Sequence, residues 1–118
     1  MINKERRKYI RINSLNLLDI SVVENQIVVN QGIGRTLNVS ESGILLETHF
    51  SVDLTSSLLL TIAIENDLIT INGKVAYCKL GKNEMYETGV QFLDMDESAM
   101  QVIGKLVKSF KIHNISNS

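Results

Sequence analysis

Five arginine and lysine side chains are crowded into the first eleven residues, MINKERRKYIR, where Glu5 is the only acid. Arg7 and Arg11 form an RxxxR pattern, and Arg6 stands directly before it. The arginine side chain is a planar fork of donors that can grip a phosphate or the O6/N7 edge of guanine. Two such forks close together could hold both the phosphate and the base of a guanine nucleotide. The same composition is also typical of a solvated basic arm, so the motif alone leaves both interpretations open.

A second group of polar residues stands in the middle of the chain, in the run NVSESG at 38–43. If a strand continues as far as Ser40, the side chains of Asn38 and Ser40 point the same way, because strand side chains alternate. An amide and a hydroxyl side by side can bond to a base edge or to a phosphate oxygen. Gly43 permits either a positive φ or a close approach of the backbone to a ligand. A polar turn between two strands would use the same residue types.

The rest of the chain offers no catalytic set. His49 and His113 are isolated, and Cys78 is the single cysteine. The sequence contains no HExxH, P-loop, GxSxG or CxxC pattern. We therefore expect neither an enzyme nor a metal site, and no cofactor. The fragment Gly32-Ile33-Gly34 follows a short apolar run, and we expect a turn there rather than a phosphate-binding loop.

These polar groups must be positioned by strands, since apolar and polar residues alternate over much of the chain. The segments with strand character are 17–22, 26–30, 35–38, 44–48, 57–64, 68–79 and 88–93. The pattern then changes to spacings of three and four, which predicts one apolar helix face. The residues of that face are Ala99, Val102, Ile103, Leu106, Val107 and Phe110, with acids before them at the expected helix start. Short antiparallel strands with one terminal helix favour a small barrel or curled sheet whose open end or face the helix covers.

Length and composition indicate one folded domain. The chain has 118 residues, 44% of them hydrophobic, and a formal net charge of -1, so no global field draws it to nucleic acid or to an anionic membrane. A single cysteine favours a reducing compartment. Neither a signal peptide nor an apolar run of the ~20 residues that span a membrane is visible. We expect a cytoplasmic protein with a flexible basic arm at 1–11, a domain at 12–113 and a polar tail at 114–118.

The two polar motifs, taken together and in this order, resemble those of the PilZ family. Arg7 and Arg11 supply RxxxR, and Asn38, Ser40 and Gly43 supply [DN]xSxxG before an apolar strand. Farther along, the run YETGVQF at 86–92 is similar to a late strand of that family, which commonly carries Gly-Val-x-Phe. A helix after that strand is also typical. The resemblance extends over nearly the whole chain, from about residue 5 to about residue 111.

The resemblance implies an all-β fold with a terminal helix, namely a six-stranded antiparallel barrel capped by a C-terminal α-helix. It implies cyclic di-GMP as the ligand, with Arg7 and Arg11 on guanine edges and phosphates. Asn38, Ser40 and Gly43 would surround one guanine. An arginine at the position of Arg6 goes with a stacked pair of ligand molecules in this family. The implied protein is a receptor and adaptor that signals by ordering its N-terminal arm and so altering the interaction with an effector protein.

Other functions stay open at this point. One is a PilZ-like protein-interaction module that binds no nucleotide. Another is a barrel that binds nucleic acid through the basic arm, which is disfavoured because the strand region is rich in acids and the chain has only three tyrosines. We expect no nucleic-acid polymer among the partners. The apolar helix face would suit a homodimer as well as it suits the core.

Overall fold

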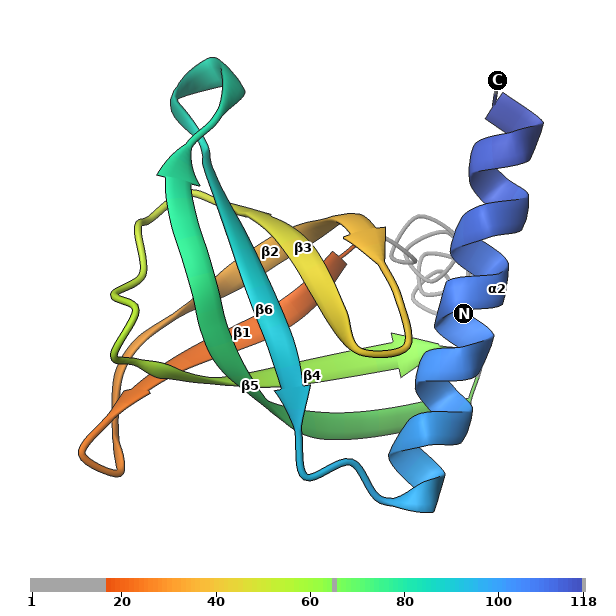
Figure 1. Ribbon diagram of the computed structural model, residues 1–118, viewed down its shortest axis with the longest axis horizontal. Coiled ribbons are helices and arrows are strands. Elements are labelled where there is room, and N and C mark those ends of the chain that lie inside the picture. Colours follow the sequence, from red (N-terminus) through yellow and green to blue (C-terminus); the bar gives the residue numbers. More distant parts are fainter. Residues whose placement is uncertain (1–16, 65, 118) are drawn as a thin grey trace, which may run out of the picture.

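The computed structural model describes residues 17–64 and 66–117, except for the side chains of residue 64 and of 113–117. The predicted basic arm, with Arg6, Arg7 and Arg11, lies outside the described residues. Six antiparallel strands close into a barrel in the order β1-β2-β3-β6-β5-β4, and one long helix follows (Figure 1). The elements are β1 (Leu17–Glu24), β2 (Ile27–Val39), β3 (Gly43–Thr48), β4 (Ser57–Ile64), β5 (Asp67–Leu80), the 3-10 turn η2 (Lys82–Glu84), β6 (Tyr86–Leu93) and α2 (Glu97–Asn117). The predicted fold class is therefore confirmed.

The barrel interior is filled by the alternate side chains that the sequence pattern predicted to share a face. In β1, Leu18, Ile20 and Val22 are buried, whereas Leu17 and Asp19 are exposed. The same alternation buries one face of β3 and β4 and of parts of the other strands, whereas the start of β2 is exposed throughout. The buried hydrophobic side chains of the strands and their connections are Leu18, Ile20, Val22, Val39, Ile44, Leu46, Val52, Leu58, Leu60, Ile62, Ile71, Val75, Val90 and Phe92.

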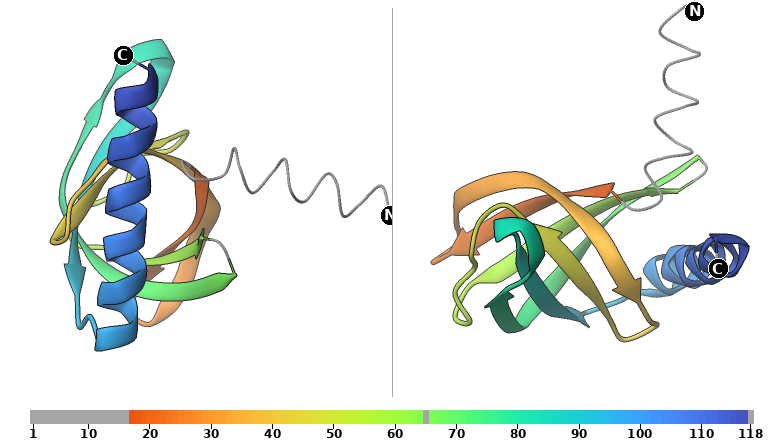
Figure 2. Two further views of the ribbon diagram at one scale, coloured as in Figure 1. Left: turned by 90° about the vertical axis from the view of Figure 1, so that its right-hand side faces the viewer. Right: turned by 90° about the horizontal axis from the view of Figure 1, so that it is seen from above.

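Helix α2 lies beside one open end of the barrel, as the two further views show (Figure 2). It contacts β5, β2 and β4. All six residues of the predicted apolar face are buried, from Ala99 to Phe110, and each large aliphatic or aromatic side chain among them contributes roughly 1.5–3 kcal/mol. The helix is capped by Asp96, whose Oδ1 accepts a hydrogen bond from the Ala99 N–H at 2.8 Å. It continues to Asn117, so most of the segment predicted as a polar tail is helical.

One expectation from the sequence is wrong. Gly32 and Gly34 do not form a turn, because β2 runs without interruption through both of them. A Cβ atom on Gly32 would lie 2.7 Å from Cε2 of Phe50, and one on Gly34 would collide with the Ile20 side chain. The glycines therefore leave room for side chains that fill the barrel. The two predicted strands at 26–30 and 35–38 are the two halves of one strand of 13 residues.

Candidate functional site

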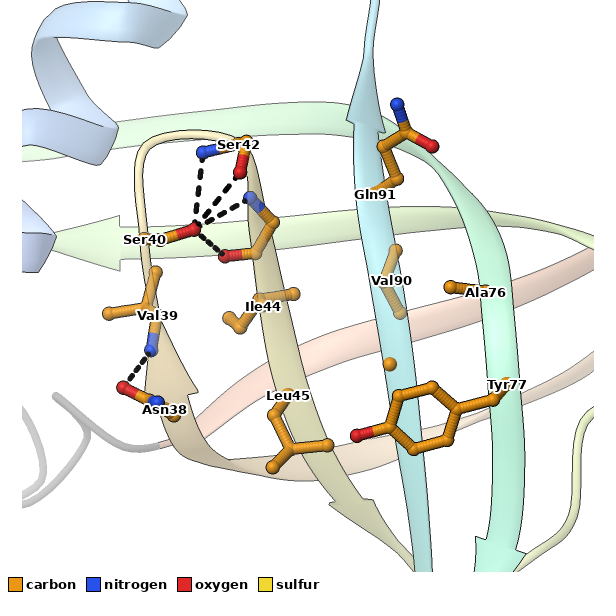
Figure 3. A pocket seen from close by; sticks show the side chains of 12 residues that line it. Asn38, Val39, Ser40, Ser42, Ile44, Leu45, Ala76, Tyr77, Val90 and Gln91 are labelled. Carbon is orange, nitrogen blue, oxygen red and sulfur yellow. Dashed lines mark hydrogen bonds between the residues drawn. The ribbon is translucent and has the colours of Figure 1, made fainter.

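A hollow of about 370 Å³ lies on the outer face of the barrel, over β2, β3, β6 and β5. Asn38, Ser40 and Gly43 all line it, so the structure brings together the three residues of the second motif (Figure 3). The other lining residues come from all four strands and from the β2–β3 turn. They are Val39, Ser42, Ile44, Leu45, Ala76, Tyr77, Gly89, Val90 and Gln91.

The β2–β3 turn is held by the Ser40 side chain. Its Oγ accepts hydrogen bonds from the N–H groups of Ser42 at 3.3 Å and Gly43 at 3.2 Å. The Ser40 N–H donates to the Gly43 carbonyl oxygen at 2.9 Å and closes the turn. Serine is suited to this role because its short hydroxyl reaches the backbone two and three residues ahead. The turn thus fixes the position of a hydroxyl at the rim of the hollow.

Gly43 is needed for close packing rather than for a positive φ. The structure describes no glycine with a positive φ. A Cβ atom on Gly43 would lie 2.5 Å from the carbonyl oxygen of Val90 in the neighbouring strand β6, and that oxygen belongs to the backbone. The positive φ that the sequence offered as one reason for this glycine is therefore wrong. The other reason, a close approach of the backbone to a ligand, stays a prediction, and the close approach in the structure is to the backbone of β6.

A bulge in β2 turns Asn38 outward. The register pairs Thr36 with Leu46 and Asn38 with Leu45, which leaves Leu37 without a partner in β3. Thr36 is buried, so strict alternation would also bury Asn38. The extra residue shifts the alternation by one, which buries Val39 and exposes Asn38. The Asn38 side chain accepts a bond from the Val39 N–H at 2.9 Å, and its amide NH₂ group makes no hydrogen bond to the described part of the chain.

A second bulge, in β5, turns Tyr77 outward on the opposite side of the hollow. Here Val75 pairs with Val90 and Tyr77 with Gly89, so Ala76 is the extra residue. Val75 is buried, whereas the Tyr77 side chain is 43% exposed. Its ring reaches across β6 toward Leu45 (Figure 3). The two bulges together direct an amide and an aromatic ring into one hollow.

Gly89 allows the Tyr77 ring to lie against the backbone of β6. A Cβ atom on Gly89 would lie 2.8 Å from Cδ1 and 3.0 Å from Cζ of that ring. Lys79 Nζ is 5.9 Å from the centroid of the same ring, a cation–π distance. Tyr77 was not predicted from the sequence as a site residue. In the sequence Tyr77 is only a tyrosine in the strand that precedes the strand with Gly89-Val90. The pairing of these two strands places the ring over Gly89, and the sequence does not show that pairing.

None of the residues that line the hollow carries a charge. The Arg35 guanidinium, in β2 but outside this lining, has its Nε bonded to Glu47 Oε1 at 3.1 Å. Lys79, near the Tyr77 ring, lies 3.9 Å from Glu87 Oε1 through its Nζ. The lining itself therefore supplies no cation for an anionic ligand. Among residues 17–64 and 66–117, no three His, Cys, Asp or Glu side chains gather where they could hold a metal ion.

Comparison with protein families matches residues 5–109 of the chain to the PilZ domain. The chain belongs to the PilZ domain family. This match includes the segment with Arg6, Arg7 and Arg11, whose placement relative to the hollow lies outside the described residues. A comparison with curated protein sequences found no match. Among the helices in the described part of this PilZ domain, none is long and apolar enough to cross a membrane.

Three solved structures share the fold of this PilZ domain. The Bacillus subtilis inhibitor of motility (MotI/DgrA) has 16% sequence identity and a TM-score of 0.59, over 82% of this chain and 47% of that one. MrkH of K. pneumonia in its apo state has 17% identity and a TM-score of 0.62, over 87% and 50%. The PilZ domain of CeSA from a cellulose-synthesizing bacterium has 9% identity and a TM-score of 0.58, over 80% and 93%. The chain thus spans about half the length of two of these proteins.

Proposed function

We propose that this PilZ domain is a receptor for cyclic di-GMP and that the hollow beside the β2–β3 turn is its nucleotide site. The observation that carries the proposal is the meeting, in one uncharged hollow, of the Asn38-x-Ser40-x-x-Gly43 motif with the Tyr77 ring. A guanine is a flat ring with a polar edge, and these groups match both features. The aromatic ring can stack on the base, while an amide and a hydroxyl bond to its edge or to a phosphate oxygen.

The arginines of the RxxxR motif complete the site in this proposal. Cyclic di-GMP carries two phosphate charges, and the residues lining the hollow have no cation to meet them. Arg7 and Arg11 supply planar forks that bind phosphate and guanine edges with paired, charge-assisted hydrogen bonds. Arg6 adds a third fork, which suits a second, stacked ligand molecule. The same arrangement explains why a chain with a net charge of -1 concentrates five cations in its first eleven residues.

The signal in this proposal is an ordering of residues 1–11 across the barrel when the ligand binds. Fixing each backbone residue costs about 1–2 kcal/mol, so several charge-assisted bonds are needed to offset the ordering of the segment. The ordered segment and the bound ligand would form a new surface, and an effector protein would read it. A cytoplasmic location and the lack of enzymatic activity stay predictions from the sequence.

Isothermal titration calorimetry of the purified chain with cyclic di-GMP tests the proposal, with GTP as the control ligand. We expect saturable binding of cyclic di-GMP and none of GTP at the same concentrations. A ratio of two ligands per chain would support the role of Arg6, and a ratio of one would remove it. No heat from a folded protein at high ligand concentration would instead favour a protein-interaction module that binds no nucleotide.

A further inference from the structure

Strand β2 extends well beyond the strand that follows it. β3 pairs only with the segment Arg35–Val39, whereas β1 pairs with the segment Ile27–Arg35. Within the described ranges 17–64 and 66–117, no strand pairs with the far side of Ile27–Gly34, which we name the β2 edge. A closed barrel normally leaves no strand edge open. Here Arg35 is the one described residue of β2 with partners in both β1 and β3.

The β2 edge lacks the residues that usually protect an open edge. Native proteins block such edges with lysine, other charges or proline. The segment at 25–34, NQIVVNQGIG, contains no charged residue and no proline. A bulge at Val29 is its one irregularity, because Val22 pairs with Asn30 and Val23 with Val28. The bulge lies toward one end and leaves the stretch from Asn30 to Gly34 regular.

The side chains of the β2 edge are apolar and exposed. Ile27 is 64% exposed and Ile33 59%, and Val28 and Val29 are each about half exposed. Three of these four residues are consecutive, so they do not follow the alternation that buries one face of a strand. Apolar side chains beside unpaired backbone groups form a surface that suits another strand, which would bury the side chains and bond to the backbone.

We propose that the β2 edge pairs in antiparallel register with the β2 edge of a second copy of this chain, about a two-fold axis at Gln31. The axis places Val29 beside Ile33 of the second copy, and Ile33 beside the other Val29. The Gln31 N–H now donates to Asn30 Oδ1 of its own strand at 2.9 Å, and a carbonyl of the second copy can replace that acceptor. The pairing extends the sheet of one barrel into the next.

A second copy suits this edge because pairing a strand with itself opposes identical residues around the axis. Like charges directly opposite each other destabilise a strand pair, and the β2 edge has no charges to oppose. In a two-fold contact the β2 edges of both copies are paired with each other. No β2 edge is left for a third copy, so the assembly stops at a dimer. Asn38 lies beyond the β2 edge, in the part of β2 that pairs with β3, so the proposed contact uses none of the residues that line the hollow.

Sedimentation velocity of the full chain without ligand, over a wide concentration range, tests the dimer. We expect a reversible monomer–dimer equilibrium. Ile33→Lys should weaken the association at least tenfold, because it places two ammonium groups in an apolar strand contact. Leu68→Lys is the matched control, since Leu68 is 70% exposed in β5 and lies outside the β2 edge. It should leave the association unchanged, and both variants should melt as the unmodified chain does.

Cysteine cross-linking tests the register. Gln31→Cys faces its own counterpart across the axis, at a separation that a disulfide can span, so mild oxidation should give a covalent dimer. Ile27→Cys should give none, because its counterpart lies eight residues along the paired strands, about 27 Å away. The unmodified chain, which retains Cys78, is the control. A monomer at every concentration, an unchanged dimer in Ile33→Lys, or equal cross-linking from both cysteine positions would overturn the proposal. An association that needs another protein would also overturn it.

Discussion

The two halves of β2 share one backbone and differ in almost everything else. The second half, Arg35–Val39, pairs with β3 and holds Asn38 at the hollow, and within it only Arg35 also pairs with β1. The first half, Ile27–Gly34, pairs with β1 alone and exposes apolar side chains. The two halves differ in what continues the sheet beside them. Next to Asn38 the sheet continues through β3, β6 and β5, and these strands form the surface of the hollow. Next to Ile27–Gly34 no described strand continues the sheet on the side away from β1, so this half is better suited to binding another strand.

The largest loss of ligand binding is expected when the arginines of the RxxxR motif are replaced. We propose that these arginines bind the ligand beside the second half of β2. Arg7→Ala or Arg11→Ala should abolish measurable binding of cyclic di-GMP, because each removes a planar donor fork from a ligand whose charges the hollow cannot balance. The melting temperature of the ligand-free protein should change little. Calorimetry and thermal unfolding measure the two quantities. A folding defect in either variant would mean that the arginine is structural.

Removal of the aromatic ring beside the second half should have the next largest effect. Base stacking on an aromatic side chain is worth about 1–3 kcal/mol, so Tyr77→Leu should weaken cyclic di-GMP binding by roughly 5- to 150-fold. Tyr77→Phe keeps the ring that lies over Gly89 and should bind nearly as well as the unmodified chain. Calorimetric affinities for the two variants test this. Equal losses in both would assign the effect to the hydroxyl and not to stacking.

Two asparagines, one in each half of β2, allow a matched comparison in which the expected loss of binding is smaller. Asn38 accepts a bond from the Val39 N–H at 2.9 Å, and Asn30 accepts one from the Gln31 N–H at the same distance. Alanine at either position removes the same local bond, so the free energies of unfolding should fall by similar amounts, about 1 kcal/mol or less. Only Asn38→Ala should weaken nucleotide binding, by about 1–2 kcal/mol, or roughly 5- to 30-fold. A loss of binding in Asn30→Ala would place the ligand elsewhere.

The smallest effect is expected at the junction of the two halves. Arg35 is the first residue of β2 that pairs with β3, and its Nε lies 3.1 Å from Glu47 Oε1. The Arg35 side chain is about half exposed, so the ion pair should contribute at most about 1 kcal/mol and less in high salt. Arg35→Gln should lower the denaturant midpoint only slightly. A large loss of stability would show that the junction, and not the buried core, holds β3 against β2.

The parts of the fold that alternation determines could be predicted from the sequence. β1 and β4 were predicted by their alternate apolar residues, and the helix by its spacing of three and four, because burial of one face is a local pattern. The continuity of β2 could not be predicted. Gly32 and Gly34 are typical of a turn, and their packing against Phe50 and Ile20 depends on contacts between distant residues.

The candidate site was predicted only in part, for a related reason. Asn38, Ser40 and Gly43 are close in sequence, so their motif placed them together. Tyr77 is far from them along the chain and reaches the hollow only because of the bulge at Ala76. Bulges depend on the register between strands, and that register is set by the packing of the whole barrel. The sequence of one strand alone therefore does not show which way the side chain of Asn38 or Tyr77 points.

Backbone amide chemical shifts, followed by NMR during a titration with cyclic di-GMP, test where the nucleotide binds. We expect the amides of Asn38, Ser40, Gly43 and Gly89 to shift strongly and to saturate together. The amides of Gln31, Gly32 and Ile33, in the first half of the same strand, should shift little. Shifts centred on the first half of β2, or no saturable shifts around the hollow, would contradict the assignment of the nucleotide site.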